Sequence, residues 1–237
     1  MPIVSAPGGP KILVTAAHPD DIEATCAGTL MLAIAQGARV RLLLATSGDK
    51  GSSDPAIDPL ALAAQRESEA QNAASILGIE AVEFLRYPDG ELENTRELRG
   101  HIVRAIREWQ PDVVFTFDPE HALPPYLSHR DHRVIGRATL DAVYPLSRDH
   151  LSFPELISKT LTPHKVAEVW LYYSGIADSW VDISSVMDRK IDARLAHACQ
   201  TPDPALLRTA WFERARIAGE AGGLPMAEAF TIIQALA

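Results

Sequence analysis

ILVTAA at residues 12–17 is followed directly by HPDD at residues 18–21. The first six residues form a short apolar run that is partly β-branched, which is typical of a buried strand. Residues 23–36 then show a helical pattern that ends at Gly37, a residue type that commonly closes helices. A buried strand followed at once by a helix is the first half of a βαβ unit, so this stretch predicts an α/β fold.

The same alternation continues along the chain. Further strands are predicted at residues 39–45, 82–85 and 112–117, and further helices at residues 59–77, 98–109 and 132–144. The last third is less regular, with strand patterns at residues 166–173 and 180–183 and a helical pattern at residues 187–199. We therefore predict one domain over residues 1–237 with a mostly parallel sheet, and residues 1–10 as a loose N-terminal extension.

Charge and cysteine content exclude several classes of protein. The chain has 22 Lys and Arg against 31 Asp and Glu, a formal net charge of −9, which disfavours binding to nucleic acid or to an anionic membrane. Its two cysteines, Cys26 and Cys199, form no disulfide or zinc-ribbon pattern. With no secretory signal and no apolar run of membrane-spanning length, we expect a cytoplasmic protein.

The HPDD segment places one imidazole and two carboxylates at the end of the first predicted strand. In open α/β sheets, ligands bind beyond the carboxyl ends of the strands. His18 and one carboxylate can ligate a divalent metal, and the second carboxylate can take a proton from metal-bound water. The alternative is purely structural, because Asp20 or Asp21 could cap the following helix and His18 could be an ordinary loop histidine.

A second cluster, HRDH at residues 129–132, follows the loop after the fourth predicted strand. His129 and His132 can share one face if both are helical, although Asp131 could again be no more than a helix cap. Both clusters fall at the same predicted edge of the sheet, which favours one metal site built from two loops. Glycine-rich nucleotide-binding motifs and a serine-hydrolase G-x-S-x-G motif are both lacking in the sequence.

The sequence resembles the LmbE-like (PIG-L) deacetylases. The resemblance rests on AHPDDIE at 17–23 and H-x-D-H at 129–132, and extends to further short motifs at residues 28–30, 66–70, 87–90, 111–115, 181–183, 189–190 and 197–200. It implies a Rossmann-like three-layer α/β sandwich. It also implies a zinc-dependent enzyme that hydrolyses the acetamide of an N-acetylglucosamine-type conjugate and releases acetate and a free amine.

The resemblance also implies roles for individual residues. His18, Asp21 and His132 would be the ligands of Zn²⁺, and the same set accepts Fe²⁺ or another divalent ion. Asp20 would be the general base. His129 would stabilise the oxyanion and protonate the leaving amine, with Asp131 orienting its ring.

Four residues are predicted to contact the amino-sugar substrate, each with a structural alternative. Arg66 and Asp89 match family positions that contact sugar, but they could be a solvated helix charge and a turn residue. Tyr126 could close over the substrate or simply pack. His197 could reach an active site, its own or that of a neighbouring copy in a homo-oligomer, or only stabilise a helix end.

Two other functions remain open from the residues alone. Two histidines and a carboxylate could hold iron(II) for oxygen chemistry, or the chain could be a non-catalytic metal-binding module. The α/β context and the second carboxylate, Asp20, favour hydrolysis over both.

Overall fold

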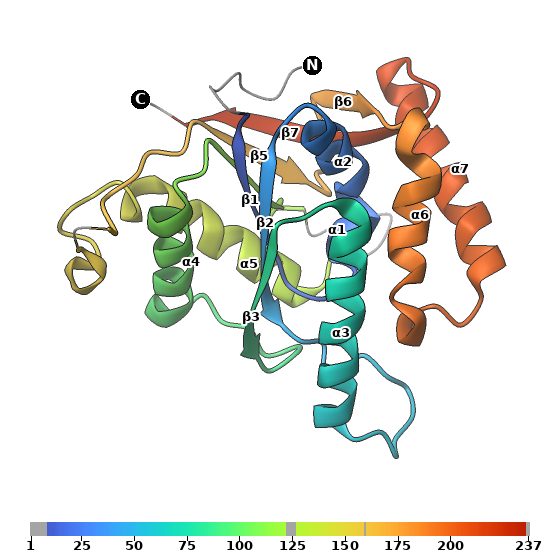
Figure 1. Cartoon of the computed structure of the whole chain (residues 1–237), viewed down its shortest axis with the longest axis horizontal. Coiled ribbons are helices and arrows are strands. Elements are labelled where there is room, and N and C mark those ends of the chain that lie inside the picture. Colours follow the sequence, from blue (N-terminus) through green and yellow to red (C-terminus); the bar gives the residue numbers. More distant parts are fainter. Residues whose placement is uncertain (1–8, 122–126, 159, 236–237) are drawn as a thin grey trace.

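A computed structural model describes residues 9–121, 127–158 and 160–235 (Figure 1). Its centre is a seven-stranded sheet in the order β3-β2-β1-β4-β5-β7-β6. Five strands are parallel: β1 (Lys11–Ala16), β2 (Arg39–Thr46), β3 (Ala81–Tyr87), β4 (Val113–Phe117) and β5 (Glu168–Tyr172). The last strand, β7 (Ala227–Gln234), runs antiparallel to both β5 and β6 (Ser179–Asp182).

Helices cover both faces of this sheet (Figure 1). One face carries α4 (Arg96–Trp109) and α5 (Arg130–Asp141). The other carries α1 (Asp21–Thr25), α2 (Ala27–Ala35), α3 (Pro59–Leu77), α6 (Met187–Leu195) and α7 (Pro204–Gly222). Short turns of other helix types lie at Ala142–Leu146, Pro154–Leu156, Ser184–Val186 and Ala198–Gln200. These three layers confirm the predicted α/β sandwich with a mostly parallel sheet.

Local sequence explains where several helices begin and end. The Asp58 side chain accepts a hydrogen bond from Leu60 N at the start of α3, and Gly78 closes this helix with a φ of 85°. Thr95 caps α4 in the same way by accepting from Leu98 N at 3.1 Å. Gly136 lets α5 approach the end of β4, because a methyl group there would lie 2.3 Å from the Phe117 carbonyl oxygen.

Two predicted helices differ from the structure. The helix expected at residues 23–36 is broken at Cys26, whose φ is −135°, and α2 begins immediately after it. The helix expected at residues 187–199 ends at Leu195. Its last residues form a separate turn at Ala198–Gln200 instead of extending α6.

The sheet order explains where a site can form. β1 and β4 are neighbours in the sheet. After β1 the chain continues to α1 on one face of the sheet, and after β4 it continues to α5 on the other face. This switch point brings the loop after β1, which carries HPDD, next to the loop before α5, which carries HRDH. Among the described residues, every helix is too short or too polar to cross a lipid bilayer.

Candidate active site

Both histidine-containing segments meet in one cleft at the carboxyl edge of the sheet. The cleft has a volume of about 270 Å³ and is lined by His18, Asp20, Asp21, Arg66, Asp89, His129, His132 and Gln200. Seven of these eight residues were predicted from the sequence as site residues. The cleft therefore joins loops after β1, β3 and β4 with the segment that follows α6.

Asp21 lies between two imidazoles. Its Oδ1 is 3.0 Å from His132 Nε2, and its Oδ2 is 3.6 Å from His18 Nδ1. Oδ2 also accepts hydrogen bonds from the backbone nitrogens of Ala17 (3.0 Å) and His18 (2.8 Å), which fix the carboxylate. Burial alone would raise the pKa of Asp21, but the two imidazoles hold that pKa well below its usual range.

Phe117, at the end of β4, supports the ring of His132. The two rings are stacked, with centroids 3.9 Å apart and an interplanar angle of 7°. His132 is on the first turn of α5, whose close approach to β4 depends on Gly136. The position of this imidazole is therefore set by the packing of α5 on the sheet.

Carboxylates also surround the far side of His18. Its Nε2 is 3.1 Å from Asp89 Oδ1 and 3.5 Å from Asp131 Oδ2, but it makes no well-directed hydrogen bond among the described residues. Burial would lower the pKa of His18, but the carboxylates of Asp131, Asp21 and Asp89 outweigh it and raise the pKa to about 12. The site thus concentrates negative charge around one buried imidazole and favours a bound cation.

Two groups of three residues could each hold a metal ion, because the donor atoms within each group all lie within 4.8 Å of one another. One consists of His18, His129 and His132, and the other of His18, Asp89 and Asp131. The set implied by the family resemblance, with Asp21 in place of His129, shares two histidines with the first group.

His129 is the residue that caps α5. Its Nδ1 accepts a hydrogen bond from the backbone nitrogen of Asp131 at 3.2 Å, so the proton of the neutral ring lies on Nε2. Burial lowers the pKa of His129, and so does the neighbouring His18, which keeps the ring neutral. The arrangement leaves one N–H available as a hydrogen-bond donor.

Asp131 contacts His129 through its backbone nitrogen, whereas its carboxylate binds the backbone of another loop. Oδ2 accepts from Gly90 N at 2.7 Å, and Oδ1 accepts from Leu92 N at 3.2 Å. Asp131 is fully buried, so these two bonds anchor the turn at residues 88–92 against α5. This turn carries Asp89 into the cleft.

Asp20 occupies the residue before α1 but does not cap that helix. Its side chain makes no capping hydrogen bond among the described residues, and its backbone is left-handed, with a φ of 90°. Asp20 Oδ1 is 3.4 Å from Arg66 Nη2, and Oδ2 is 3.4 Å from Arg194 Nη2. Burial and the neighbouring Asp21 raise the pKa of the Asp20 carboxyl group, against the opposing effect of nearby basic side chains.

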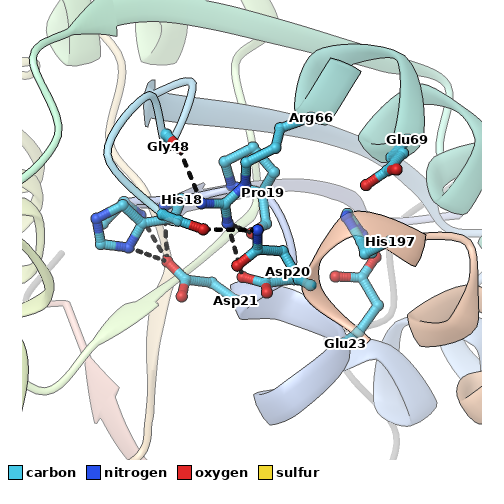
Figure 2. Close-up of polar contacts among 12 residues, drawn as sticks. His18, Pro19, Asp20, Asp21, Glu23, Gly48, Arg66, Glu69 and His197 are labelled. Carbon is cyan, nitrogen blue, oxygen red and sulfur yellow. Dashed lines mark hydrogen bonds and ion pairs between the residues drawn. The ribbon is translucent and has the colours of Figure 1, made fainter. Parts of the chain in front are cut away.

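Two of the residues predicted to contact substrate, Arg66 and Asp89, are buried in the wall of the cleft. Arg66 is buried, and its guanidinium donates to Gly48 O (3.1 Å) and Pro19 O (2.7 Å) (Figure 2). Asp89 is buried at the cleft wall, where its Oδ2 accepts from Lys50 N at 3.3 Å. Tyr126 lies outside the described residues.

His197 is only 1% exposed and does not line the cleft. Its Nε2 is 3.4 Å from Glu23 Oε1, and neither ring nitrogen has a hydrogen-bond partner among the described residues. Figure 2 shows it between Glu23 and Glu69, to the right of Asp20. In this chain the histidine thus packs inside the molecule, next to the residues that form the cleft.

Sequence reasoning assigned no role to two residues of the site. Gln200 lines the cleft and donates from Nε2 to Gly51 O at 2.9 Å. The one signal for it in the sequence is the short motif at residues 197–200, which is part of the family resemblance. Arg194 reaches Asp20 from α6, but an arginine on a helix carries no local pattern that distinguishes it from a solvated charge.

The chain is similar to known deacetylases in both sequence and fold. The PIG-L family, described as GlcNAc-PI de-N-acetylase, matches residues 13–143. Diacetylchitobiose deacetylase from Thermococcus kodakarensis is 35% identical over 193 residues, covering 81% of this chain and 71% of the relative. The solved structure of N,N'-diacetylchitobiose deacetylase from Pyrococcus horikoshii superimposes with a TM-score of 0.88 at 31% identity, over 94% of this chain and 84% of that one.

One further solved structure shares only the fold. It is 4-carboxy-2-hydroxymuconate hydratase from Pseudomonas putida KT2440, with a TM-score of 0.78 at 20% identity over 96% of this chain and 98% of that one. The family match covers more than half of the chain, and it includes both histidine segments. On this evidence the chain belongs to the PIG-L family of de-N-acetylases.

Proposed function

We propose that this chain is a metal-dependent N-deacetylase acting on an N-acetylglucosamine-type saccharide or conjugate, from which it releases acetate and a free amine. One observation carries the proposal. The neighbours Asp20 and Asp21 face different partners, Asp21 between two imidazoles and Asp20 in the cleft beside them. This separation gives one carboxylate for a metal and one for a proton, as hydrolysis requires.

The residues of the cleft fit a divalent ion. His18 Nε2 is a buried nitrogen without a hydrogen-bond partner among the described residues, and three carboxylates converge on its ring. We propose His18, Asp21 and His132 as the ligands, because two imidazoles and one carboxylate form an open, catalytic set. Zinc is the proposed ion, and iron(II) is the alternative that the same donors accept.

The chemistry of this chain's own residues follows from their positions. When bound, the divalent ion would lower the pKa of a water molecule and polarise the amide carbonyl. Asp20, whose pKa is raised, takes the proton from the attacking water and returns it to the amide nitrogen as the C–N bond breaks, so that the amine leaves neutral. His129, neutral and protonated on Nε2, donates a hydrogen bond to the oxygen of the tetrahedral intermediate. Asp131 holds His129 through its backbone nitrogen.

Arg66 and Asp89 are the proposed contacts to the sugar, because both line the cleft. When ionised, Asp89 accepts hydrogen bonds and donates none, which suits sugar hydroxyl groups. The two cysteines, Cys26 and Cys199, are free thiols, and we propose a cytoplasmic location because thiols persist in a reducing compartment.

Two other reactions are less well supported. An iron(II) oxygenase would need no general base, whereas Asp20 is held beside the ligand set. The hydratase that shares the fold shows that the fold alone does not decide the reaction. The names of the more similar relatives favour amide hydrolysis.

The test is to incubate the metal-loaded protein with a panel of N-acetylglucosaminyl compounds, including diacetylchitobiose, and to measure freed amine and acetate together. Equal amounts of the two products are expected from at least one compound. Asp20→Asn serves as the matched control, because it removes the base and keeps the shape. Oxygen consumption, or no amine from any compound, would contradict the proposal.

A further inference from the structure

We propose that Arg194 is a positioning residue that holds the Asp20 carboxylate in the orientation from which it takes a proton. The inference rests on the proposed function and extends it to a residue of α6. Arg194 lies far from both histidine segments in the sequence, yet its Nη2 is 3.4 Å from Asp20 Oδ2.

Asp20 needs an external support. Its backbone has a φ of 90°, a conformation that costs energy for a residue with a side chain. Its carboxylate makes no hydrogen bond to the helix that follows. The orientation of the carboxylate is therefore set by the groups that face its two oxygens, and not by a cap.

Two guanidinium groups supply that support, one for each oxygen. Arg66 Nη2 is 3.4 Å from Oδ1, and Arg194 Nη2 is 3.4 Å from Oδ2. The side chain of Arg194 is 11% exposed and that of Arg66 is 5% exposed, so little solvent screens either contact. Figure 2 shows Asp20 beside Arg66, which also holds the loops at Pro19 and Gly48.

The guanidinium of Arg194 is itself fixed in place. Nη1 donates to Thr201 Oγ1 at 2.7 Å, and Nη2 donates to Gln200 O at 3.1 Å. A third contact, to His197 O, is 3.5 Å long. These acceptors are neutral groups of the segment after α6, so the positive charge is placed before substrate arrives.

Arg194 is the better arginine for a test of this idea. Arg66 binds two loop carbonyls, so its replacement would disturb the cleft directly. The hydrogen bonds of Arg194 stay within its own segment, and its ion pair to Asp20 reaches out of that segment. A change at Arg194 thus leaves the loops at Pro19 and Gly48 in place and acts directly on Asp20.

The experiment compares Arg194→Met and Arg194→Lys with the wild-type enzyme, alone and combined with Asp20→Asn. Arg194→Met should lower kcat by about 10- to 100-fold with KM and metal content nearly unchanged, while the melting temperature falls because the hydrogen bonds to Thr201 and Gln200 are lost. Arg194→Lys should recover part of the loss. In the Asp20→Asn background the same change should cost less than about threefold, because the two residues act through one group.

A matched control comes from the same helix. Arg189 is on α6 and donates from Nη2 to Ile76 O at 2.8 Å, away from Asp20, so Arg189→Met should leave kcat unchanged. An equal fractional loss for Arg194→Met in both backgrounds would show a merely structural role and overturn the inference. Unchanged kcat for Arg194→Met would overturn it as well.

A crystal structure of Arg194→Met gives a readout that does not depend on activity. The Asp20 carboxylate should turn away from its position between the two arginines, whereas an unmoved carboxylate would overturn the inference. If Arg194→Met does not fold, Arg194→Gln is crystallised instead, because its amide can still donate to Thr201 or Gln200 but carries no charge for Asp20. A wild-type enzyme that deacetylates no compound would refute the proposed function, and the crystal structure would still decide the role of Arg194.

Discussion

Glu228 Oε2 accepts hydrogen bonds from both the backbone nitrogen of Thr29, at 2.7 Å, and its Oγ1, at 2.6 Å. The other oxygen of Glu228 accepts from Gly28 N at 2.9 Å and from Lys190 Nζ at 2.5 Å. A carboxylate of β7 thus caps α2 and pairs with a buried lysine of α6. This contact accounts for the helix break at Cys26, because α2 begins where the carboxylate meets its first amides.

Glu228→Ala should therefore destabilise the whole domain. The change leaves the buried ammonium group of Lys190 without a partner and the start of α2 without a cap. The free energy of unfolding should fall by about 3–5 kcal/mol, measured by urea denaturation. The control is Glu220→Ala on α7, which breaks an exposed ion pair with Arg216 and should change stability by less than about 0.5 kcal/mol. Equal effects of the two changes would contradict the prediction.

Metal content separates the two ligand sets that share His18 and His132. Purified protein should carry about one divalent ion per chain by elemental analysis, and His18→Ala and His132→Ala should each lose most of it. If Asp21 is the third ligand, Asp21→Asn loses the ion and His129→Ala keeps it. The reverse result would assign His129 as the ligand. If His18→Ala and His132→Ala both kept the full amount of metal ion, the proposed metal site would be refuted.

Asp20→Asn should separate binding from chemistry. The amide keeps the size of the side chain but cannot take a proton, so kcat should fall on the order of 10²-fold or more. Metal content and melting temperature should stay close to wild type. Unchanged turnover would assign the base to another group. Glu23 would be tested next, although its carboxylate faces His197 and is only 2% exposed.

His164 should make the protein less stable in mild acid. Its Nε2 is 2.8 Å from Pro111 O, and burial lowers the pKa of its ring, with smaller opposing effects from Pro111 and Asp112. Below about pH 6.5 the unfolded chain binds the proton more readily than the folded one, so stability falls as pH drops through this range. At higher pH the ring is neutral in both states and the contribution vanishes.

His164→Gln is the matching variant, because an amide nitrogen can still donate to Pro111 O and does not titrate. The loss of stability between pH 7.5 and pH 5, from urea midpoints, should be smaller in the variant than in the wild type. An identical loss in both proteins would show that His164 does not contribute.

The parallel half of the fold was predictable because its signals are local. Apolar runs of strand length alternate with helical patterns, and the helix predicted at residues 59–77 has the same bounds as α3, with Gly78 directly after it. The two histidine segments were located at the ends of predicted strands. Their meeting in one cleft follows from the switch point between β1 and β4.

The rest of the fold and of the candidate site depends on contacts between residues that are far apart in the sequence. Only Ala215 and Gly219 of α7 are buried, so this helix has no clear apolar stripe to recognise. The hydrogen bonds of Glu228 to Gly28 and Thr29, and the ion pair of Arg194 with Asp20, each join residues more than 170 positions apart. No local pattern encodes such pairs, so neither the break at Cys26 nor the support of Asp20 could be inferred.

The place of β7 has a consequence for biosynthesis. It follows β6 in the chain but lies between β5 and β6, so the ribosome makes both of its neighbours before it makes β7. Until then the nascent chain presents an open edge at β5, a site for wrong pairing with other chains. The antiparallel part of the sheet can therefore be completed only after β7 has emerged from the exit tunnel, and chaperones that cover an open strand edge would matter most during this interval.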